Sequence, residues 1–283
     1  MNMKLGVVSF AVALAIGAFG VANATPIVTN GGFSQISTST GVNPNTPSQV
    51  NYPSGFFSSY GEFVTGWTTT GSLFSQNVIW VPSASAASSV NAKDVDTNWP
   101  LGPRPLFPTS VTAPPTTSGS TAFMAMQANL ANSGIQQNIS GLTVGQSYTL
   151  SFYWAATMDN IDTGVETSQL TASVAGQSFK TITQTVSSNN GFLGLHSTPT
   201  FNGWLSESFT FVADTSSSVL KFIANGTPSG LPPYALLTGV SIDALPVPEP
   251  PVLAMFGGGL LGLGLLTLAA RRRRQRDDGH DAA

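Results

Sequence analysis

Short runs in which apolar and polar residues alternate are the feature that most constrains how this chain folds. In residues 147–154 every second residue, from Tyr148 to Trp154, is aromatic or apolar. Successive side chains of a β-strand point to opposite faces, so this run predicts a strand with one buried face. Similar runs recur between residues 25 and 245, separated by Gly, Asn, Pro and Ser, and no stretch of ten residues there has a helical period. The pattern predicts an all-β sandwich.

Two pairs of these strands are predicted to form hairpins. The first pair is Leu170–Val174 and Ser178–Ile182, joined by Ala-Gly-Gln. The second pair is Glu207–Ala213 and Val219–Ala224, joined by residues 214–218. Small polar residues and Gly favour the backbone conformations of tight turns. A strand at 135–139 and a turn at 142–146 are predicted to lead into the strand at 147.

Residues 93–118 differ from the rest, because they contain six prolines and little alternation. This composition predicts a long surface loop inserted between strands. Residues 43–53 predict a second, shorter loop.

Charge is scarce, at 8% of residues, against about 25% in ordinary soluble proteins. Between residues 25 and 250 there are ten acidic and four basic residues, so no basic patch for nucleic acid is expected. The chain has no cysteine, which excludes disulfides, thiolate metal sites and cysteine nucleophiles.

Residues 1–24 match a secretory signal peptide. Lys4 supplies the positive start, residues 5–21 are apolar except for one serine, and Ala22 and Ala24 form a cleavage site of the A-x-A type. Cleavage is predicted after Ala24. An uncleaved N-terminal anchor is the alternative.

The other end of the chain predicts one transmembrane helix. Residues 252–270 are nineteen residues without charge. A helix of that length spans roughly 28 Å, close to the ~30 Å hydrocarbon core of a bilayer. An arginine cluster follows at residues 271–276, comprising Arg271, Arg272, Arg273, Arg274 and Arg276. Such clusters stay on the cytoplasmic side, which places residues 25–245 outside, and residues 277–283 are a short polar tail.

The order of features in residues 246–276 resembles the PEP-CTERM sorting signal. Pro248, Glu249 and Pro250 precede the apolar segment and the arginines. The resemblance implies that an exosortase recognises these three residues and removes the tail at the outer face of the inner membrane of a Gram-negative bacterium that makes exopolysaccharide. The protein would be anchored in the inner membrane transiently and would then reach the cell surface or extracellular matrix. A permanent single-pass anchor with a proline-rich stalk is the alternative.

Residues 25–245 resemble the galactose-binding-like jelly rolls, which include many carbohydrate-binding modules and the DUF642 proteins. The resemblance rests on Asn30-Gly-Gly-Phe33, on Gly66-Trp67, on the stretch 134–152 and on Leu237–Ile242. It implies a jelly-roll β-sandwich. Members often carry acidic residues that bind a structural Ca²⁺, but Ser34, Thr238 and Gly239 stand at those places here. Asp243 alone cannot supply six to eight oxygens, so no metal site and no cofactor are expected.

No catalytic constellation is visible in the sequence, and the protein is expected not to be an enzyme. His196 is the single histidine between residues 25 and 245, and it lies in a loop-like segment without the partners that triad or metal chemistry needs, so a surface or capping role is expected. Asp159, Asp162 and Glu166 are close in sequence. Asp159 to Asp162 can be read as a polar turn, or as a site for a cation or sugar hydroxyls; a polysaccharide hydrolase using these carboxylates is the weakest functional hypothesis.

Aromatic side chains are the better indication of function, since their faces stack on sugar rings. Trp67 and Trp154 are expected in the core from their strand pattern. Trp99, Trp204 and Tyr234 flank loops and are the candidate glycan contacts. The leading hypothesis is therefore a non-catalytic exported protein associated with exopolysaccharide, with signal peptidase and exosortase as its partners during export. A structural or adhesive surface protein whose own Ser and Thr residues are glycosylated is the alternative.

Overall fold

The computed structural model describes residues 26–38, 48–49, 62–70, 78–87, 107–160, 163–188, 200–228 and 233–246. Almost all regular structure within these residues is β-strand. The strands are β1 (Ile36–Thr38), β2 (Ser48–Gln49), β3 (Glu62–Val64), β4 (Thr68–Thr69), β5 (Val78–Val81), β6 (Phe123–Gln127), β7 (Gly134–Ser140), β8 (Ser147–Met158), β9 (Gly164–Val174), β10 (Gln177–Lys180), β11 (Gln184–Ser188), β12 (Leu205–Val212), β13 (Ser217–Thr227) and β14 (Pro233–Ala244). The helical elements are one turn each, α1 (Ala84–Ala87) and the 3-10 turn η1 (Thr116–Ser118).

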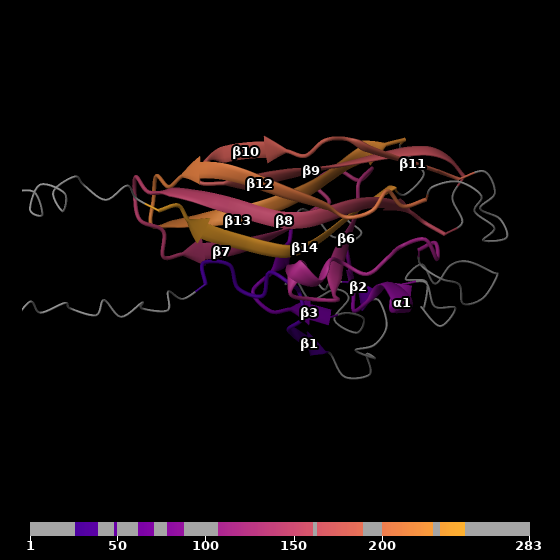
Figure 1. The fold of residues 1–283 in the computed structure, drawn as a ribbon, viewed down its shortest axis with the longest axis horizontal. Helices are drawn as coiled ribbons and strands as arrows, with labels where there is room; N and C mark the ends of the chain where they lie inside the picture. The colour runs from indigo at the N-terminus through magenta and orange to yellow at the C-terminus, as the bar shows by residue number, and fades with distance from the viewer. Residues whose placement is uncertain are drawn as a thin grey trace, which may run out of the picture.

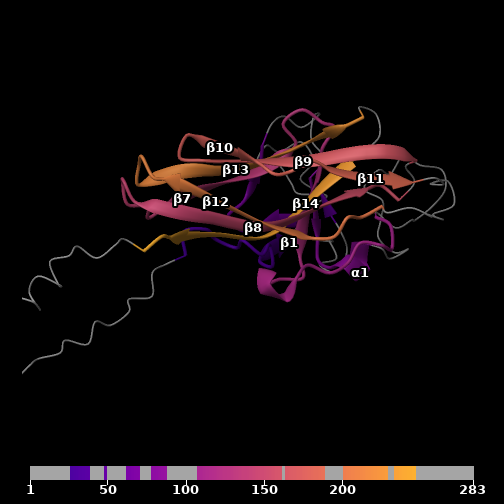
Figure 2. The ribbon, with the colours of Figure 1, turned by 45° about the horizontal axis from the view of Figure 1, so that its top comes forward.

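Two antiparallel sheets pack face to face as a sandwich (Figures 1 and 2). We call the sheet with strand order β12-β8-β14-β6-β5-β2 the front sheet. The back sheet has the order β10-β9-β13-β7-β4, and β11 also pairs with β9. Strands β1 and β3 form a separate two-stranded ribbon. The predicted all-β sandwich, of the jelly-roll kind, is confirmed.

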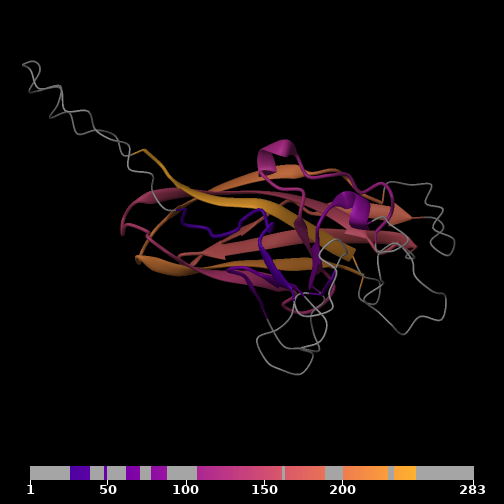
Figure 3. The same cartoon turned by 90° about the horizontal axis from the view of Figure 1, so that it is seen from below.

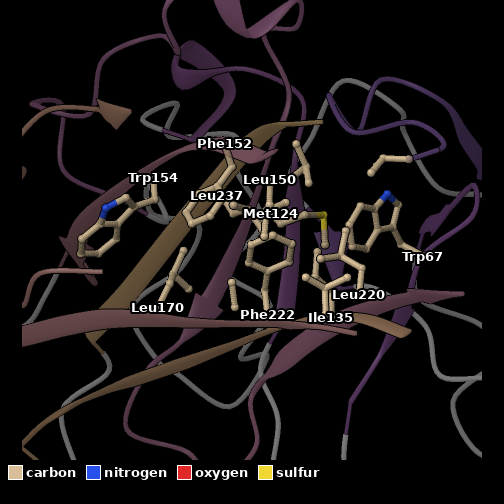
Figure 4. Close-up of a cluster of buried hydrophobic side chains, with 14 of the residues drawn as sticks. Trp67, Met124, Ile135, Leu150, Phe152, Trp154, Leu170, Leu220, Phe222 and Leu237 are labelled. Atoms are coloured by element: carbon tan, nitrogen blue, oxygen red, sulfur yellow. The ribbon is translucent and has the colours of Figure 1, made fainter. Parts of the chain in front are cut away.

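The alternation that predicted β8 appears in the structure as a buried face from Ser147 to Trp154, and the four residues that follow are all buried. Tyr148, Leu150, Phe152 and Trp154 point between the sheets, where they meet Leu170 and Phe222 of the back sheet (Figure 4). The ring of Phe222 packs edge-on against Phe152, with centroids 5.1 Å apart. Trp67 and Trp154 both belong to this core, as expected.

One predicted hairpin is confirmed. Strands β9 and β10 pair antiparallel, with Val174 opposite Gln177, so Ala175 and Gly176 form a two-residue turn. Both turn residues have positive φ, 49° and 68°. This is the backbone of a type I′ turn, whose twist matches that of the paired strands.

The second predicted hairpin is wrong. Strand β12 pairs with β8 in the front sheet, whereas β13 pairs with β7 and β9 in the back sheet. The residues between them therefore cross from one sheet to the other. Residues 141–146 make the same kind of crossing between β7 and β8. Alternation predicts which face of each strand is buried, but it does not distinguish pairing within a sheet from packing across the sandwich.

The described part of the proline-rich region covers apolar surface. Phe107 and Val111 are buried against the outer face of the front sheet, in a cluster with Phe123, Tyr234 and the first and last alanines of α1. Burial of these two side chains anchors residues 107–118 to that face, and apart from η1 these residues form an irregular connection that runs over the sheet. Residues 93–106, and the loop predicted at 43–53 apart from β2, lie outside the described residues.

The N-terminal turn at residues 30–33 lies against the last strand, β14. The backbone N–H of Val240 donates to the carbonyl of Gly31 at 3.0 Å. A Cβ on Gly31 would lie 1.8 Å from the carbonyl oxygen of Val240, so only glycine permits this approach.

Four chain segments meet at one end of the sandwich, which we call the exit end (Figure 3). It consists of the turns 141–146, 175–176 and 213–216 together with residues 245–246. Backbone hydrogen bonds join Gly145 to Ala213, Leu142 to Ser216, and Leu245 to Ser147. The indigo start of the described chain also lies toward this end of the sandwich, so the described chain begins and ends on the same side (Figures 1 and 3).

The terminal segments predicted from sequence lie outside the described residues. These are the signal peptide at 1–24, the sorting motif at 248–250, the apolar segment at 252–270 and the residues that follow it. Within the described part of the chain, no helix has the length and hydropathy needed to cross a membrane.

Candidate functional site

Rows of hydroxyl side chains cover half of the outer face of the front sheet. Strand register places Ser208, Ser151 and Ser241 side by side on β12, β8 and β14. The next row is Thr210, Thr149 and Asp243. All six side chains are exposed or half-buried, because their strand neighbours take the buried positions. We call this surface, with Ser206 and Tyr153 in the adjoining row, the hydroxyl face.

The 3-10 turn η1 packs against β14 and borders one side of the hydroxyl face. The hydroxyls of Thr117 and Tyr153 are 2.6 Å apart and share a hydrogen bond. Gly239 has a φ of 62° and lies under this contact, where a Cβ would come within 3.0 Å of both Ser118 and the Tyr153 ring. The half-buried Tyr153 ring is thus held in place between the hydroxyl face and the turn η1.

Trp204 lies just before β12, two residues from Ser206 of the hydroxyl face. Its indole N–H donates to the carbonyl of Thr112 at 3.0 Å. Its ring packs edge-on against Phe123 and Phe201, with centroid distances of 5.5 and 6.3 Å. The side chain is half-buried, so part of it stays accessible beside the hydroxyl face. This placement is compatible with the predicted role of Trp204 in glycan contact.

Tyr234 does not have the surface position that was predicted for it. Its side chain is 2% exposed and packs edge-on against Phe107, with ring centroids 5.1 Å apart. The proline-rich segment covers it, so the ring offers no face to a ligand. Trp99, the third predicted contact, lies outside the described residues.

Tyr153 is the aromatic residue that sequence reasoning missed. The signal was present in the same alternation that predicted β8. Tyr148, Leu150, Phe152 and Trp154 face the core, so Tyr153 had to face outward as the one aromatic residue on the other side of the strand.

Charge on the two outer faces differs in sign. Asp243 is the exposed carboxylate of the hydroxyl face, and its Oδ2 accepts a hydrogen bond from Ser241 Oγ at 3.1 Å. Lys180 and Lys221, the two basic residues within the described ranges, occupy outward positions on the back sheet. The hydroxyl face therefore carries a weak negative charge among many neutral hydrogen-bonding groups.

The interior becomes polar toward the end of the sandwich opposite the exit end. On β9 the inward positions change from Leu170 to Ser168 and then Glu166, which are both fully buried. Gln184 of β11 lies opposite Ser168, and its Oε1 accepts the Ala156 N–H at 3.0 Å. Within the described part of the chain, neither Ser168 Oγ nor Gln184 Nε2 has a hydrogen-bond partner.

The residues present do not fit the structural calcium ion of the jelly rolls that the sequence resembles. Thr238 is fully buried and its hydroxyl donates to the Ala122 carbonyl at 2.8 Å. Asn30 uses its amide to hold Gln35 and Thr65. Only Asp243 contributes a carboxylate among the positions considered, and hard cations need several oxygens. Among the described residues no three His, Cys, Asp or Glu side chains gather as a metal site.

The carboxylates near the end of β8 are only partly described. Asp159 and Asn160 are buried, which differs from an open polar turn. Asp162 and His196 lie outside the described residues, so the two readings of this segment stay open.

Comparison with known proteins found no matching family model and no matching curated protein. Solved structures with a similar fold include TmCBM61 in complex with beta-1,4-galactotriose, at 11% identity and a TM-score of 0.32, covering 64% of this chain and 90% of that chain. The CBM22-1–CBM22-2 tandem domain of Paenibacillus barcinonensis Xyn10C aligns at 14% identity and a TM-score of 0.32, covering 67% of this chain and 44% of that one. The CBM22-1–GH10 modules of Clostridium thermocellum Xyn10B, complexed with xylohexaose, align at 13% identity and a TM-score of 0.30, covering 65% and 27%. Because these TM-scores are below 0.5, the neighbours assign no ligand to this chain, and its function is argued from its own residues.

Proposed function

We propose that this protein is a non-catalytic, exported carbohydrate-binding protein that associates with exopolysaccharide through the hydroxyl face. The observation that carries the proposal is the juxtaposition of two complete rows of hydroxyl and carboxylate side chains with the partly exposed rings of Tyr153 and Trp204.

The chemistry of this surface suits a sugar polymer. Sugar hydroxyls both donate and accept hydrogen bonds, and Ser and Thr hydroxyls do the same. Aromatic faces cover the apolar C–H faces of sugar rings. The side chains of both rows are exposed or half-buried on the outer face of the sheet, which suits a chain that extends beyond the site at both ends.

Export and sorting belong to the same proposal and rest on the sequence of the two ends. Signal peptidase would cleave after Ala24, and an exosortase would recognise Pro248, Glu249 and Pro250 and remove the tail. The protein would then reach the cell surface or matrix of a Gram-negative bacterium. The described chain begins and ends on the side of the exit end. This arrangement is compatible with cleavage of both terminal segments at one membrane surface.

Co-sedimentation of residues 25–245 with the host's own exopolysaccharide tests the binding. We expect the protein to pellet with the polymer, and the double variant Tyr153→Ala, Trp204→Ala to remain largely in the supernatant. The control variant Thr185→Ala, Asn225→Ala changes exposed polar residues on the outer face of the back sheet. Loss of binding in the control alone would move the site to that face. Failure of the unmodified protein to pellet would contradict the proposal.

A glycosylated structural or adhesive surface protein is the second candidate. The observation in its favour is that hydroxyl side chains also cover the back sheet, where Thr167 and Thr227 pair at 2.7 Å and Thr171 holds Asn225 at 3.0 Å. A mass of the mature protein well above its sequence mass, together with no polymer binding, would favour it.

A further inference from the structure

The exit end carries most of the exposed apolar side chains of the sandwich. The large apolar residues that are well exposed within the described ranges are Val144, Val165, Ile182, Val212, Val219 and Leu245. Four of these six, Val144, Val212, Val219 and Leu245, lie at or next to the exit-end turns, so the exposed apolar side chains are concentrated at this end of the sandwich.

Three of the four lie around Ser147. Val212 lies opposite Ser147 in the β12–β8 pair, and the Leu245 N–H donates to the Ser147 carbonyl at 2.9 Å on the other side. Val144 is at the tip of the turn that leads directly into Ser147 and is 64% exposed. The fourth, Val219, lies near the same end on the back sheet, opposite Asn138.

The chain leaves this end toward its apolar segment. Five residues, 247–251, separate the last described residue, Pro246, from Val252. Six fully extended residue steps reach at most about 22 Å. If residues 252–270 span the bilayer, the exit end is held within that distance of the lipid surface whatever path the linker takes.

We propose that the exit end rests on the lipid bilayer, with Val144, Val212 and Leu245 inserted among the headgroups while the tail is in place. This inference rests on the membrane-spanning tail of the proposed function. A weak apolar contact suffices, because a short tether keeps the two surfaces at high effective concentration. Asp214 and Asp243 lie near this end, and Lys180 and Lys221 lie farther along the back sheet, so the contact suits neutral rather than anionic headgroups.

Site-specific fluorescence in vesicles tests the inference directly. The chain contains no cysteine, so a single introduced thiol can be labelled without background. The full-length chain would be reconstituted into phosphatidylcholine–phosphatidylethanolamine vesicles with an environment-sensitive dye at Val144→Cys or at Val165→Cys. These two valines are equally exposed, at 64%, and lie at opposite ends of the sandwich. Headgroup spin-labelled lipid should remove most of the emission at position 144 and little at position 165.

A second set of variants separates contact from mere proximity. A dye at Thr215→Cys, in the exit-end turn, should be quenched in the otherwise unmodified chain. Quenching should fall when Val144, Val212 and Leu245 are all changed to Ser, and should persist when Val165 and Ile182 are changed instead.

Flotation of the vesicles distinguishes the two ways in which the inference can fail. If the chain does not float with the lipid, the spanning tail is wrong and the inference falls with it. If the chain floats but positions 144 and 165 are quenched equally, the tail stands and the docked exit end is wrong. Energy transfer between labelled copies at position 144, without quenching by lipid, would assign the apolar group to self-association and would also overturn the inference.

Discussion

Gln137 holds the backbone of Thr29 through two hydrogen bonds of 2.8 Å, one accepted by its Oε1 and one donated by its Nε2. The same Nε2 also reaches the Gly66 carbonyl at 3.1 Å. A single buried amide on β7 therefore joins three segments that are distant in sequence.

Replacing Gln137 by Leu should lower the free energy of unfolding by about 3 kcal/mol, because buried backbone groups lose their partners. The neighbouring Gln136 points outward on the same strand and is the matched control. Gln136→Leu should change stability by no more than about 0.5 kcal/mol. Denaturant unfolding of residues 25–245, followed by tryptophan fluorescence, measures both variants, and equal effects would contradict the assigned role of Gln137.

Gly31→Ala should be among the most damaging single-atom additions to the fold. The new Cβ would meet the Val240 carbonyl, which is backbone and cannot rotate away. We expect a loss of about 3 kcal/mol. Gly141→Ala meets nothing within 4 Å and pays only for its φ of +88°, a cost of about 1 kcal/mol. Thermal unfolding of both variants under identical conditions checks the order.

Ser168→Ala should stabilise the protein by about 1 kcal/mol, since it removes a buried hydroxyl without a hydrogen-bond partner among the described residues. Thr181→Ala provides the opposite case. Thr181 Oγ1 accepts the Leu170 N–H and donates to the Ile182 carbonyl, both at 3.0 Å. Its removal should cost about 1 kcal/mol. A destabilised Ser168→Ala protein would show that the Ser168 hydroxyl is satisfied, for example by buried water.

Tyr153 separates the contribution of ring stacking from that of its hydroxyl. Tyr153→Ala should lower the affinity for polysaccharide by about 1 kcal/mol, or roughly fivefold. Tyr153→Phe keeps the ring but loses the contact with Thr117, and its effect should be smaller. Isothermal titration with a soluble fragment of the polymer measures both affinities. A larger loss for Phe than for Ala would exclude stacking as the main interaction.

Much of the sandwich could be predicted from residue alternation, because the period of two is set locally by the geometry of a strand. That is why β8 and the pairing of β9 with β10 agree with the prediction, although the turn is one residue shorter than predicted because Gln177 belongs to β10. The pairing of β12 with β8 rather than with β13 could not be predicted. The alternating pattern of β12 and β13 is the same whether the two strands pair within one sheet or lie in different sheets. Contacts between strands that are distant in sequence decide between these arrangements.

The candidate site was predicted less well than the fold. Trp204 and Tyr234 both flank apparent loops in the sequence, and nothing local distinguishes them. The two side chains differ in exposure because residues 107–115 cover Tyr234 and leave part of Trp204 accessible. Which side chain is covered depends on where a proline-rich segment folds back, and alternation carries no information on that path.

The contact between Gly31 and Val240 also has a consequence for timing. The first turn of the domain gains its partner only when the last strand is available, and Thr29 must wait for Gln137, 108 residues further along the chain. In a chain that crosses a membrane with its N-terminus first, the turn at Gly31 would lack its contact with Val240 until nearly the whole domain had crossed. Contacts of such long sequence separation form slowly, so the trailing residues that follow Val240 would hold the domain at the membrane during the interval in which it closes.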